Sequence, residues 1–338
     1  MHAPRHAAAR LLAVLALALT GCTGATGTPP EIVESLADGR SGAVSFATRA
    51  PYDFVDLADG GAPEDRIAGR LVLPEGDGAV RAAAILSHGA GGTGGRQDRM
   101  ADWLAGRGIA AFVLDHFGPR GIGSTVRDQL RATEQTMVAD LFAARALLAT
   151  HPRIGDAPAG VMGWSKGATA ATLSILSRVA GAAGAEPFDF AVAFYPFCGF
   201  ALGEEPVATP LLMLLAGADD WTPAAPCADL ARDWAAAGDP VAAVVFEDAP
   251  HGFDSGMWWT IPVGRAITVR DRSDRCTLDL GPDLATRTVD GAHRLGDVAG
   301  RVAFLDDCGE RGVTFGGDGA ATEAAYDRVA AFLAERLP

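Results

Sequence analysis

The chain has 338 residues, 42 of them acidic and 28 basic, and its net charge at neutral pH is −14. Hydrophobic residues make up 49% of the sequence, which excludes a disordered chain, and the length suits one large domain with an insert. The acidity also argues against a nucleic-acid partner, because phosphate binding needs clustered lysine and arginine.

The first 21 residues are typical of a secretory signal peptide. Arg5 and Arg10 precede the apolar run Leu11–Leu19, which is too short for a bilayer span of about 20 residues. The run ends in Leu-Thr-Gly-Cys22, which resembles the lipobox of bacterial lipoproteins, although an ordinary signal peptide with an incidental cysteine is an alternative. We therefore expect an exported protein, lipidated on Cys22 and anchored by the lipid in a membrane of the bacterial cell envelope, on its periplasmic or outer face. A signal peptide (1–21) and a tether (22–43) would precede a domain at 44–338.

Apolar runs bounded by glycine or proline predict strands, and apolar residues at helical spacing predict helices. The predicted strands are 52–57, 66–73, 82–87, 109–115, 159–164, 190–194, 211–216 and 241–246. The predicted helices are 97–107, 126–150, 166–179, 224–237 and 322–337. This alternation predicts an α/β protein with a mostly parallel central sheet and helices on both faces.

Residues 255–318 interrupt the alternation. They are rich in Asp, Arg and Gly, show no strong periodicity, and contain Trp258 and Trp259. So long an irregular stretch inside a compact domain is usually functional or disordered. We expect an insert or lid before the last helix.

Gly163-Trp164-Ser165-Lys166-Gly167 follows a predicted strand and begins a predicted helix. That is the context of a nucleophile elbow, in which a sharp turn exposes the serine hydroxyl above the sheet. Lys166 is the only lysine in the chain. We expect its side chain to point to solvent or to an acidic neighbour, rather than to form a Ser–Lys dyad, because adjacent helical residues diverge by about 100°.

A base and an acid follow the serine in the order that α/β-hydrolases use. Asp219 and Asp220 follow the predicted strand 211–216, and His251 follows the strand 241–246. All lie at carboxyl ends of strands, where a parallel sheet carries its functional loops. His251 would take the proton of Ser165, and one of the two aspartates would hold the imidazole in place.

The glycine-rich stretch 87–92 follows another buried strand, so its backbone can approach a ligand closely. We expect the N–H groups of Ala90 and Lys166 to form an oxyanion hole. His88 is predicted to be a structural hydrogen-bonding residue beneath this loop rather than a second base. The sequence contains no nucleotide-binding fingerprint and no metal-ligand spacing, so we expect no cofactor and no metal.

Six stretches resemble the dienelactone hydrolase family of α/β-hydrolases. They are Ser-His-Gly-Ala-Gly-Gly (87–92), Leu-Asp-His-Phe-Gly-Pro-Arg-Gly (114–121), Gly-Trp-Ser-Lys-Gly (163–167), Tyr-Pro-Phe-Cys (195–198), Asp-Asp-Trp-Thr-Pro-Ala-Ala-Pro-Cys (219–227) and His-Gly-Phe-Asp (251–254). The resemblance covers about 50–254 and the last helix, and implies the α/β-hydrolase fold and activity on carboxylic esters or lactones.

The resemblance also implies a triad of Ser165, Asp219 and His251. The interval from Asp219 to Pro223 fits the family pattern and favours Asp219 over Asp220 as the acid. The namesake enzymes have a cysteine nucleophile, so the serine is similar to the esterase-type branch of the family.

The cysteines other than Cys22 are even in number, as in a disulfide-bonded exported protein. Four cysteines allow three pairings, of which we favour Cys198–Cys227 and Cys276–Cys308. The first two follow neighbouring strands, and adjacent strands lie about 5 Å apart, so a bridge beside the acid is feasible. The second pair would staple the insert. Free buried thiols are the alternative.

Arg120, Trp164, Phe117 and Trp258 are candidates for substrate binding. Arg120 suits a carboxylate or acyl group, with a surface ion pair as the equal alternative. The aromatic residues, with Phe197 and Trp259, suit an apolar pocket, although each is more often part of the core. The predicted function is a serine hydrolase acting on a small-molecule ester or lactone through an acyl-enzyme. The alternatives are an acyltransferase with the same triad and a non-catalytic binding lipoprotein.

Overall fold

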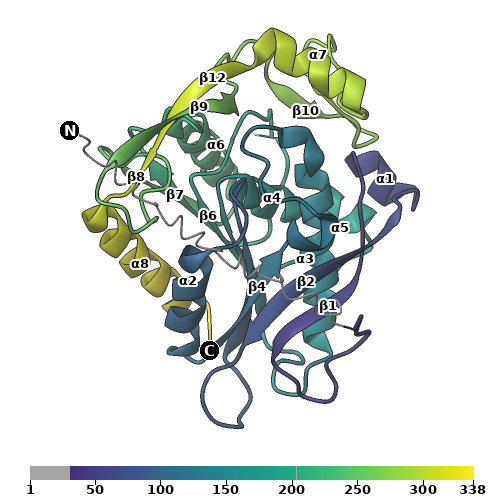
Figure 1. The fold of residues 1–338 in the computed structure, drawn as a ribbon, viewed down its shortest axis with the longest axis vertical. Coiled ribbons are helices and arrows are strands. Elements are labelled where there is room, and N and C mark those ends of the chain that lie inside the picture. The colour runs from purple at the N-terminus through teal and green to yellow at the C-terminus, as the bar shows by residue number, and fades with distance from the viewer. Residues whose placement is uncertain (1–30, 203) are drawn as a thin grey trace, which may run out of the picture.

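The computed structural model describes residues 31–202 and 204–338 (Figure 1). The predicted signal peptide, Cys22 and the first part of the tether lie outside the described residues. The central sheet has eight strands in the order β1-β2-β4-β3-β5-β6-β7-β8. Their bounds are β1 Gly42–Arg49, β2 Glu64–Val72, β3 Ala82–Ser87, β4 Ile109–Asp115, β5 Ala159–Trp164, β6 Phe190–Phe194, β7 Leu211–Ala216 and β8 Val241–Phe246.

Strands β3 to β8 pair in parallel, whereas β2 pairs antiparallel with β1 and with β4. Every residue of β3, β5, β6 and β7 is buried, as continuous apolar runs in a parallel sheet require. The mostly parallel sheet of the predicted α/β-hydrolase fold is therefore confirmed.

Helices cover both faces of the sheet (Figure 1). On one face the core includes apolar side chains of α3 (Glu134–Ala149), α4 (Lys166–Ser174), α5 (Ser177–Ala182) and α6 (Ala224–Ala237). On the other face it includes those of α2 (Gly95–Ala105) and α8 (Gly319–Ala334). Because both faces are covered, the loops at the strand ends are left to form a site.

The N-terminal part of the domain differs from the sequence prediction. Strand β1 was not predicted, and the predicted strand 52–57 is instead the short helix α1 (Phe54–Ala58). The helix begins there because Asp53 and Asp56 form a capping box, in which each carboxylate accepts a backbone N–H of the first turn. Hydrogen bonds to short polar side chains outweighed the apolar pattern.

Two predicted helices are shorter than expected. The helix predicted at 126–150 begins at Glu134, because the Thr133 side chain caps it, and the short 3₁₀ helices η1 (Gly118–Arg120) and η2 (Gln129–Arg131) precede it. The helix predicted at 166–179 is divided into α4 and α5.

The last part of the predicted tether packs against the domain. Leu36 is fully buried, and its N–H donates to Thr150 Oγ1 at 2.8 Å. Val33 N donates to Ser45 O on β1. Residues from 33 onward therefore belong structurally with the hydrolase domain.

The 255–318 insert has secondary structure of its own. It contains β9 (Thr260–Thr268), β10 (Leu278–Leu280), β11 (Thr286–Thr288), α7 (Val298–Cys308) and β12 (Glu310–Gly316). Strands β9 and β12 form one antiparallel pair and β10 and β11 another, and in Figure 1 these elements lie together along the upper edge of the domain. The predicted bond between Cys276 and Cys308 is present and joins the end of α7 to the segment before β10. Within residues 31–202 and 204–338, no helix is long and apolar enough to cross a membrane.

Candidate active site

Ser165 occupies a strained turn between β5 and α4. Its backbone has φ 53° and ψ −120°, a conformation that is rare for a residue with a side chain. The glycines on either side permit the turn: a Cβ at Gly163 would lie 2.2 Å from Gly167 O, and one at Gly167 would lie 2.3 Å from Ser87 O. The Gly-x-Ser-x-Gly pattern thus has a direct steric cause.

A continuous chain of hydrogen bonds joins Ser165, His251 and Asp219. His251 Nε2 lies 3.0 Å from Ser165 Oγ, and His251 Nδ1 lies 2.7 Å from Asp219 Oδ2. Asp219 follows β7 and His251 follows β8, so the parallel sheet brings both loops to the end of β5. The histidine and the aspartate are both buried.

The structure separates the roles of the two neighbouring aspartates. Asp219 Oδ1 accepts the N–H groups of Trp221 and Thr222, both at 2.8 Å, which leaves Oδ2 directed at His251. Asp220 faces the insert instead, where its carboxylate accepts Thr314 N at 2.7 Å and Thr314 Oγ1 at 3.1 Å. Of the two aspartates, only Asp219 contacts the imidazole of His251.

Thr222 and Trp221 support the histidine, and the sequence prediction missed both. Thr222 Oγ1 lies 3.0 Å from Asp219 Oδ2 and 3.1 Å from His251 Nδ1, so it touches both partners. The Trp221 ring centroid lies 4.8 Å from that of His251. Both residues belong to the Asp-Asp-Trp-Thr stretch that resembles the family. The sequence alone, however, does not distinguish a residue that supports the histidine from one that only packs in the core.

The insert also contacts the histidine loop. Gly316 N, at the end of β12, donates to His251 O at 3.0 Å. On the other strand of the pair, Thr268 Oγ1 donates to Trp221 O at 2.6 Å, and Trp221 Nε1 donates to Ile267 O. The antiparallel pair of β9 and β12 therefore holds the acid loop and the histidine loop together.

Two residues beside Ser165 have backbone N–H groups that are available for an oxyanion. Ala90 and Lys166 both line this cavity, and neither N–H donates a hydrogen bond within the described part of the chain. Lys166 is the first residue of α4, where the N–H has no partner within the helix. The pair has the composition of the predicted oxyanion hole.

His88 is fully buried beneath this loop, in a neutral form. Its Nδ1 donates to Gly89 O at 2.8 Å, and its Nε2 accepts His116 N at 3.1 Å. Burial and the neighbouring His116 lower the pKa of His88 to about 3. This is the arrangement expected of a structural hydrogen-bonding residue.

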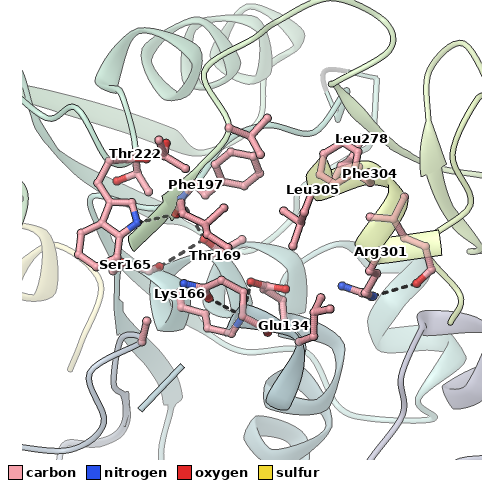
Figure 2. A pocket seen from close by; sticks show the side chains of 18 of the residues that line it. Glu134, Ser165, Lys166, Thr169, Phe197, Thr222, Leu278, Arg301, Phe304 and Leu305 are labelled. Carbon is pink, nitrogen blue, oxygen red and sulfur yellow. Dashed lines mark hydrogen bonds and ion pairs between the residues drawn. The ribbon is translucent and has the colours of Figure 1, made fainter. Parts of the chain in front are cut away.

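A cavity of about 130 Å³ lies beside Ser165 (Figure 2). Its wall is mostly apolar and comes from the hydrolase core and from the insert alike. The apolar lining residues are Leu130, Phe197, Phe200, Trp221, Ile267, Val269, Leu278, Leu295, Phe304 and Leu305.

One side of the cavity carries charged groups, two of which form an ion pair. Lys166 Nζ lies 2.8 Å from Glu134 Oε1, so the lone lysine points to an acidic neighbour and away from Ser165 (Figure 2). Burial alone would raise the pKa of Glu134, but Lys166 and the nearby Arg301 outweigh it and lower that pKa. The prediction missed Glu134 and Arg301, because no motif marks either.

None of the four residues that were predicted to bind substrate lines this cavity. Trp164 is fully buried and donates from Nε1 to Asp254 Oδ2 at 2.6 Å. Phe117 is packed on His88, and Trp258 is 85% exposed outside the cavity. Of the aromatic residues considered with them, Phe197 does line the cavity.

Arg120 belongs to a buried network beneath the oxyanion loop. Its Nη1 and Nη2 donate to Asp140 at 2.7 and 2.9 Å, and its Nε donates to Asp65. Asp140 also contacts His116 Nδ1 at 2.8 Å, and His116 Nε2 contacts Ser87 Oγ at 2.9 Å. The guanidinium is fully engaged in this second Ser–His–Asp arrangement, which leaves it no group for a substrate.

The predicted disulfide Cys198–Cys227 is present next to the acid loop, with a Cα–Cα distance of 5.1 Å. It joins the segment after β6 to the first turns of α6. Because Phe197 precedes it and Asp219 lies between the two linked segments, it fixes both the cavity wall and the acid loop.

A mostly parallel α/β sheet with a strained serine after β5, an aspartate after β7 and a histidine after β8 defines a hydrolase-type fold and site. The sequence profile of the dienelactone hydrolase family matches residues 67–256, more than half of the chain. The protein belongs to the dienelactone hydrolase family, and it is a hydrolase of the ester or lactone type.

Among solved structures, the chain is similar to a thermophilic esterase from Thermogutta terrifontis with butyrate bound. The two are 17% identical, with a TM-score of 0.44, over 55% of this chain and 80% of that one. A dienelactone hydrolase from Anabaena variabilis is 20% identical, with a TM-score of 0.44, over 56% of this chain and 82% of that one. At these scores we draw no functional conclusion from the two structures. No curated protein matches the chain.

Proposed function

We propose that the protein hydrolyses carboxylic esters or lactones with Ser165 as nucleophile, His251 as general base and Asp219 as the orienting acid. One observation carries the proposal: a hydrogen-bonded chain from Asp219 through His251 ends at a strained serine that opens on a cavity. Membership of the dienelactone hydrolase family supports the same class of reaction.

The geometry supports a two-step reaction. His251 Nε2 takes the proton of Ser165 Oγ as this oxygen attacks the carbonyl carbon of the ester. The N–H groups of Ala90 and Lys166 stabilise the negative oxygen that forms. His251 then gives the proton to the departing alcohol, leaving an acyl group on Ser165. Water, activated by the same histidine, releases the acid. Throughout, Asp219 holds the Nδ1–H of His251 and stabilises the imidazolium.

Two measurements on the native protein test this proposal. A fluorophosphonate probe should label one serine, which peptide mass spectrometry should assign to Ser165, and p-nitrophenyl acetate should be hydrolysed with a burst that reports the acyl-enzyme. Denatured protein is the control for labelling. Absence of both labelling and hydrolysis would overturn the proposal.

We also propose that the protein is exported and held at the cell envelope by a lipid on Cys22. The two disulfides support export, because such bonds persist in oxidising compartments. Mass spectrometry of the N-terminus and membrane fractionation of the full chain test this proposal, with Cys22→Ser as the matched variant. A native chain that is unprocessed and unlipidated would contradict it.

A further inference from the structure

Helix α7 of the insert directs one face into the cavity beside Ser165. Arg301, Phe304 and Leu305 line the cavity, and their spacing of three and four residues places them on the same side of the helix (Figure 2). The opposite face carries Ala303 and Asp306 and is exposed to solvent, and Val302 at the edge of this face is 42% exposed. The insert therefore contributes a wall of the site.

This wall is fixed to the hydrolase domain. Arg301 Nη2 donates to Tyr52 O and to Gln135 Oε1, both at 3.0 Å, and its Nε donates to Leu295 O. The last residue of α7 is Cys308, which the disulfide ties to Cys276. With one end tied covalently and the middle held by a buried arginine, α7 is a rigid boundary rather than a mobile lid.

The side chains that line the cavity indicate which kind of substrate group would lie against α7. Phe304 and Leu305 share the cavity lining with Phe197 from the hydrolase core and Ile267 from β9, so an apolar chain entering from Ser165 would be surrounded by apolar side chains. Of the charged groups on the other side, Lys166 pairs with Glu134, and the Arg301 guanidinium donates to Leu295 O, Tyr52 O and Gln135 Oε1. The hydroxyl groups of Thr222 and Thr268, which also line the cavity, already donate to backbone carbonyls.

We infer that α7 determines the acyl specificity: the cavity receives an apolar acyl chain attached to Ser165, and Phe304 and Leu305 set the length that it accepts. This inference rests on the proposed function and names its substrate class as esters of apolar carboxylic acids. Acyl chains that are too long for the cavity would have to displace α7, which is fixed at two points.

The test compares kcat/KM for p-nitrophenyl acetate, butyrate, octanoate and laurate. Phe304→Ala and Leu305→Ala should raise the ratio of kcat/KM for the longest ester that is hydrolysed to kcat/KM for the shortest by about tenfold or more. The reason is that one methylene in an apolar pocket changes kcat/KM by about 10- to 200-fold. Leu305→Trp should lower the same ratio, which keeps the inference testable if an alanine variant fails to fold. Val302→Ala, on the solvent face of the same helix, is the matched control and should leave the ratio unchanged.

A second series separates acyl from alcohol binding. Ethyl, butyl and octyl acetates vary only the alcohol, and the α7 variants should leave their relative rates unchanged. If the variants alter the alcohol series instead, or alter neither series while fluorophosphonate still labels Ser165, the inference is wrong and the proposed function stands. If the native protein is neither labelled nor active, the proposed function itself has failed.

Discussion

The molecule contains two Ser–His–Asp arrangements, and they differ in what surrounds them. Ser165 lines a cavity, and the buried His251 and Asp219 are linked to it by hydrogen bonds. Ser87, His116 and Asp140 are linked by equally short hydrogen bonds but are wholly buried. The same three residue types thus occur with similar contacts in two regions of one domain.

The comparison teaches that hydrogen-bonded order alone does not define a nucleophile. Ser87 ends the regular strand β3, whereas Ser165 is held at φ 53° with its hydroxyl beside the cavity. Asp140 also has other partners than Asp219 has. Although burial would raise the pKa of Asp140, hydrogen bonds from Arg120 and His116 lower it. We assign the first arrangement to chemistry and the second to stability.

The largest expected difference is in the loss of activity when each of the two serines is replaced. Ser165→Ala should lower kcat by about 10⁴-fold or more, because the reaction loses its nucleophile. Ser87→Ala should stay within about threefold of the native kcat while losing about 1 kcal/mol of unfolding free energy with its hydrogen bond. Hydrolysis of p-nitrophenyl acetate and urea unfolding measure both. Equal activity losses in the two variants would contradict the assignment.

The next largest effect concerns the aspartates. Asp219→Asn should lower kcat by about 10⁴-fold, because the amide no longer holds the required histidine tautomer. Asp220→Asn keeps an acceptor for Thr314 N and should lose less than tenfold. The pH profiles of kcat for both variants are the measurement. A larger loss at Asp220 would identify it as the acid instead.

The buried arrangement should show its importance in stability. Asp140→Asn should lower the unfolding free energy by about 3 kcal/mol, because it leaves Arg120 without its buried countercharge. Asp229→Asn breaks only an exposed pair with Arg232 and should leave the urea midpoint unchanged. If Asp140→Asn removes activity at full stability, the division of roles is wrong.

The smallest expected effect is a pH dependence due to His88, which contacts the buried arrangement through His116 N. Its pKa is about 3 in the folded protein, below the unfolded value of about 6.5, so the unfolded chain binds the proton first. Stability should therefore fall as the pH drops below about 6.5, by about 2 kcal/mol between pH 7.5 and pH 5. Urea unfolding at both pH values should show a smaller difference in His88→Gln than in the native protein. An identical difference would exclude this contribution.

Much of the sheet could be predicted from the sequence. Strands β3 to β8 begin and end where predicted, because continuous apolar runs bounded by glycine or proline leave little choice. Strand β1 and helix α1 could not be predicted in this way. The helix depends on carboxylate capping by Asp53 and Asp56, and β1 depends on pairing with β2.

The site, like the fold, could be predicted only in part from the sequence. The predicted serine, histidine and aspartate come together because each follows a strand of one parallel sheet, a rule that needs only chain order. The cavity wall could not be predicted, since Glu134, Arg301 and Phe304 reach it through long-range packing with no local pattern. The ion-pair alternative for Arg120 could not be preferred from the sequence, because its partners, Asp65 and Asp140, are distant in sequence.

The hydrogen bond from Gly316 N to His251 O has a consequence for engineering. A shortened enzyme that joins the histidine loop directly to α8 would lose this bond, the Asp220–Thr314 contact and the Thr268–Trp221 contact in one step. The 255–318 segment is therefore not an interchangeable module. Any attempt to exchange it for the insert of a relative has to carry over the β9–β12 strand pair and also α7, because Arg301 holds this helix to Tyr52 and Gln135.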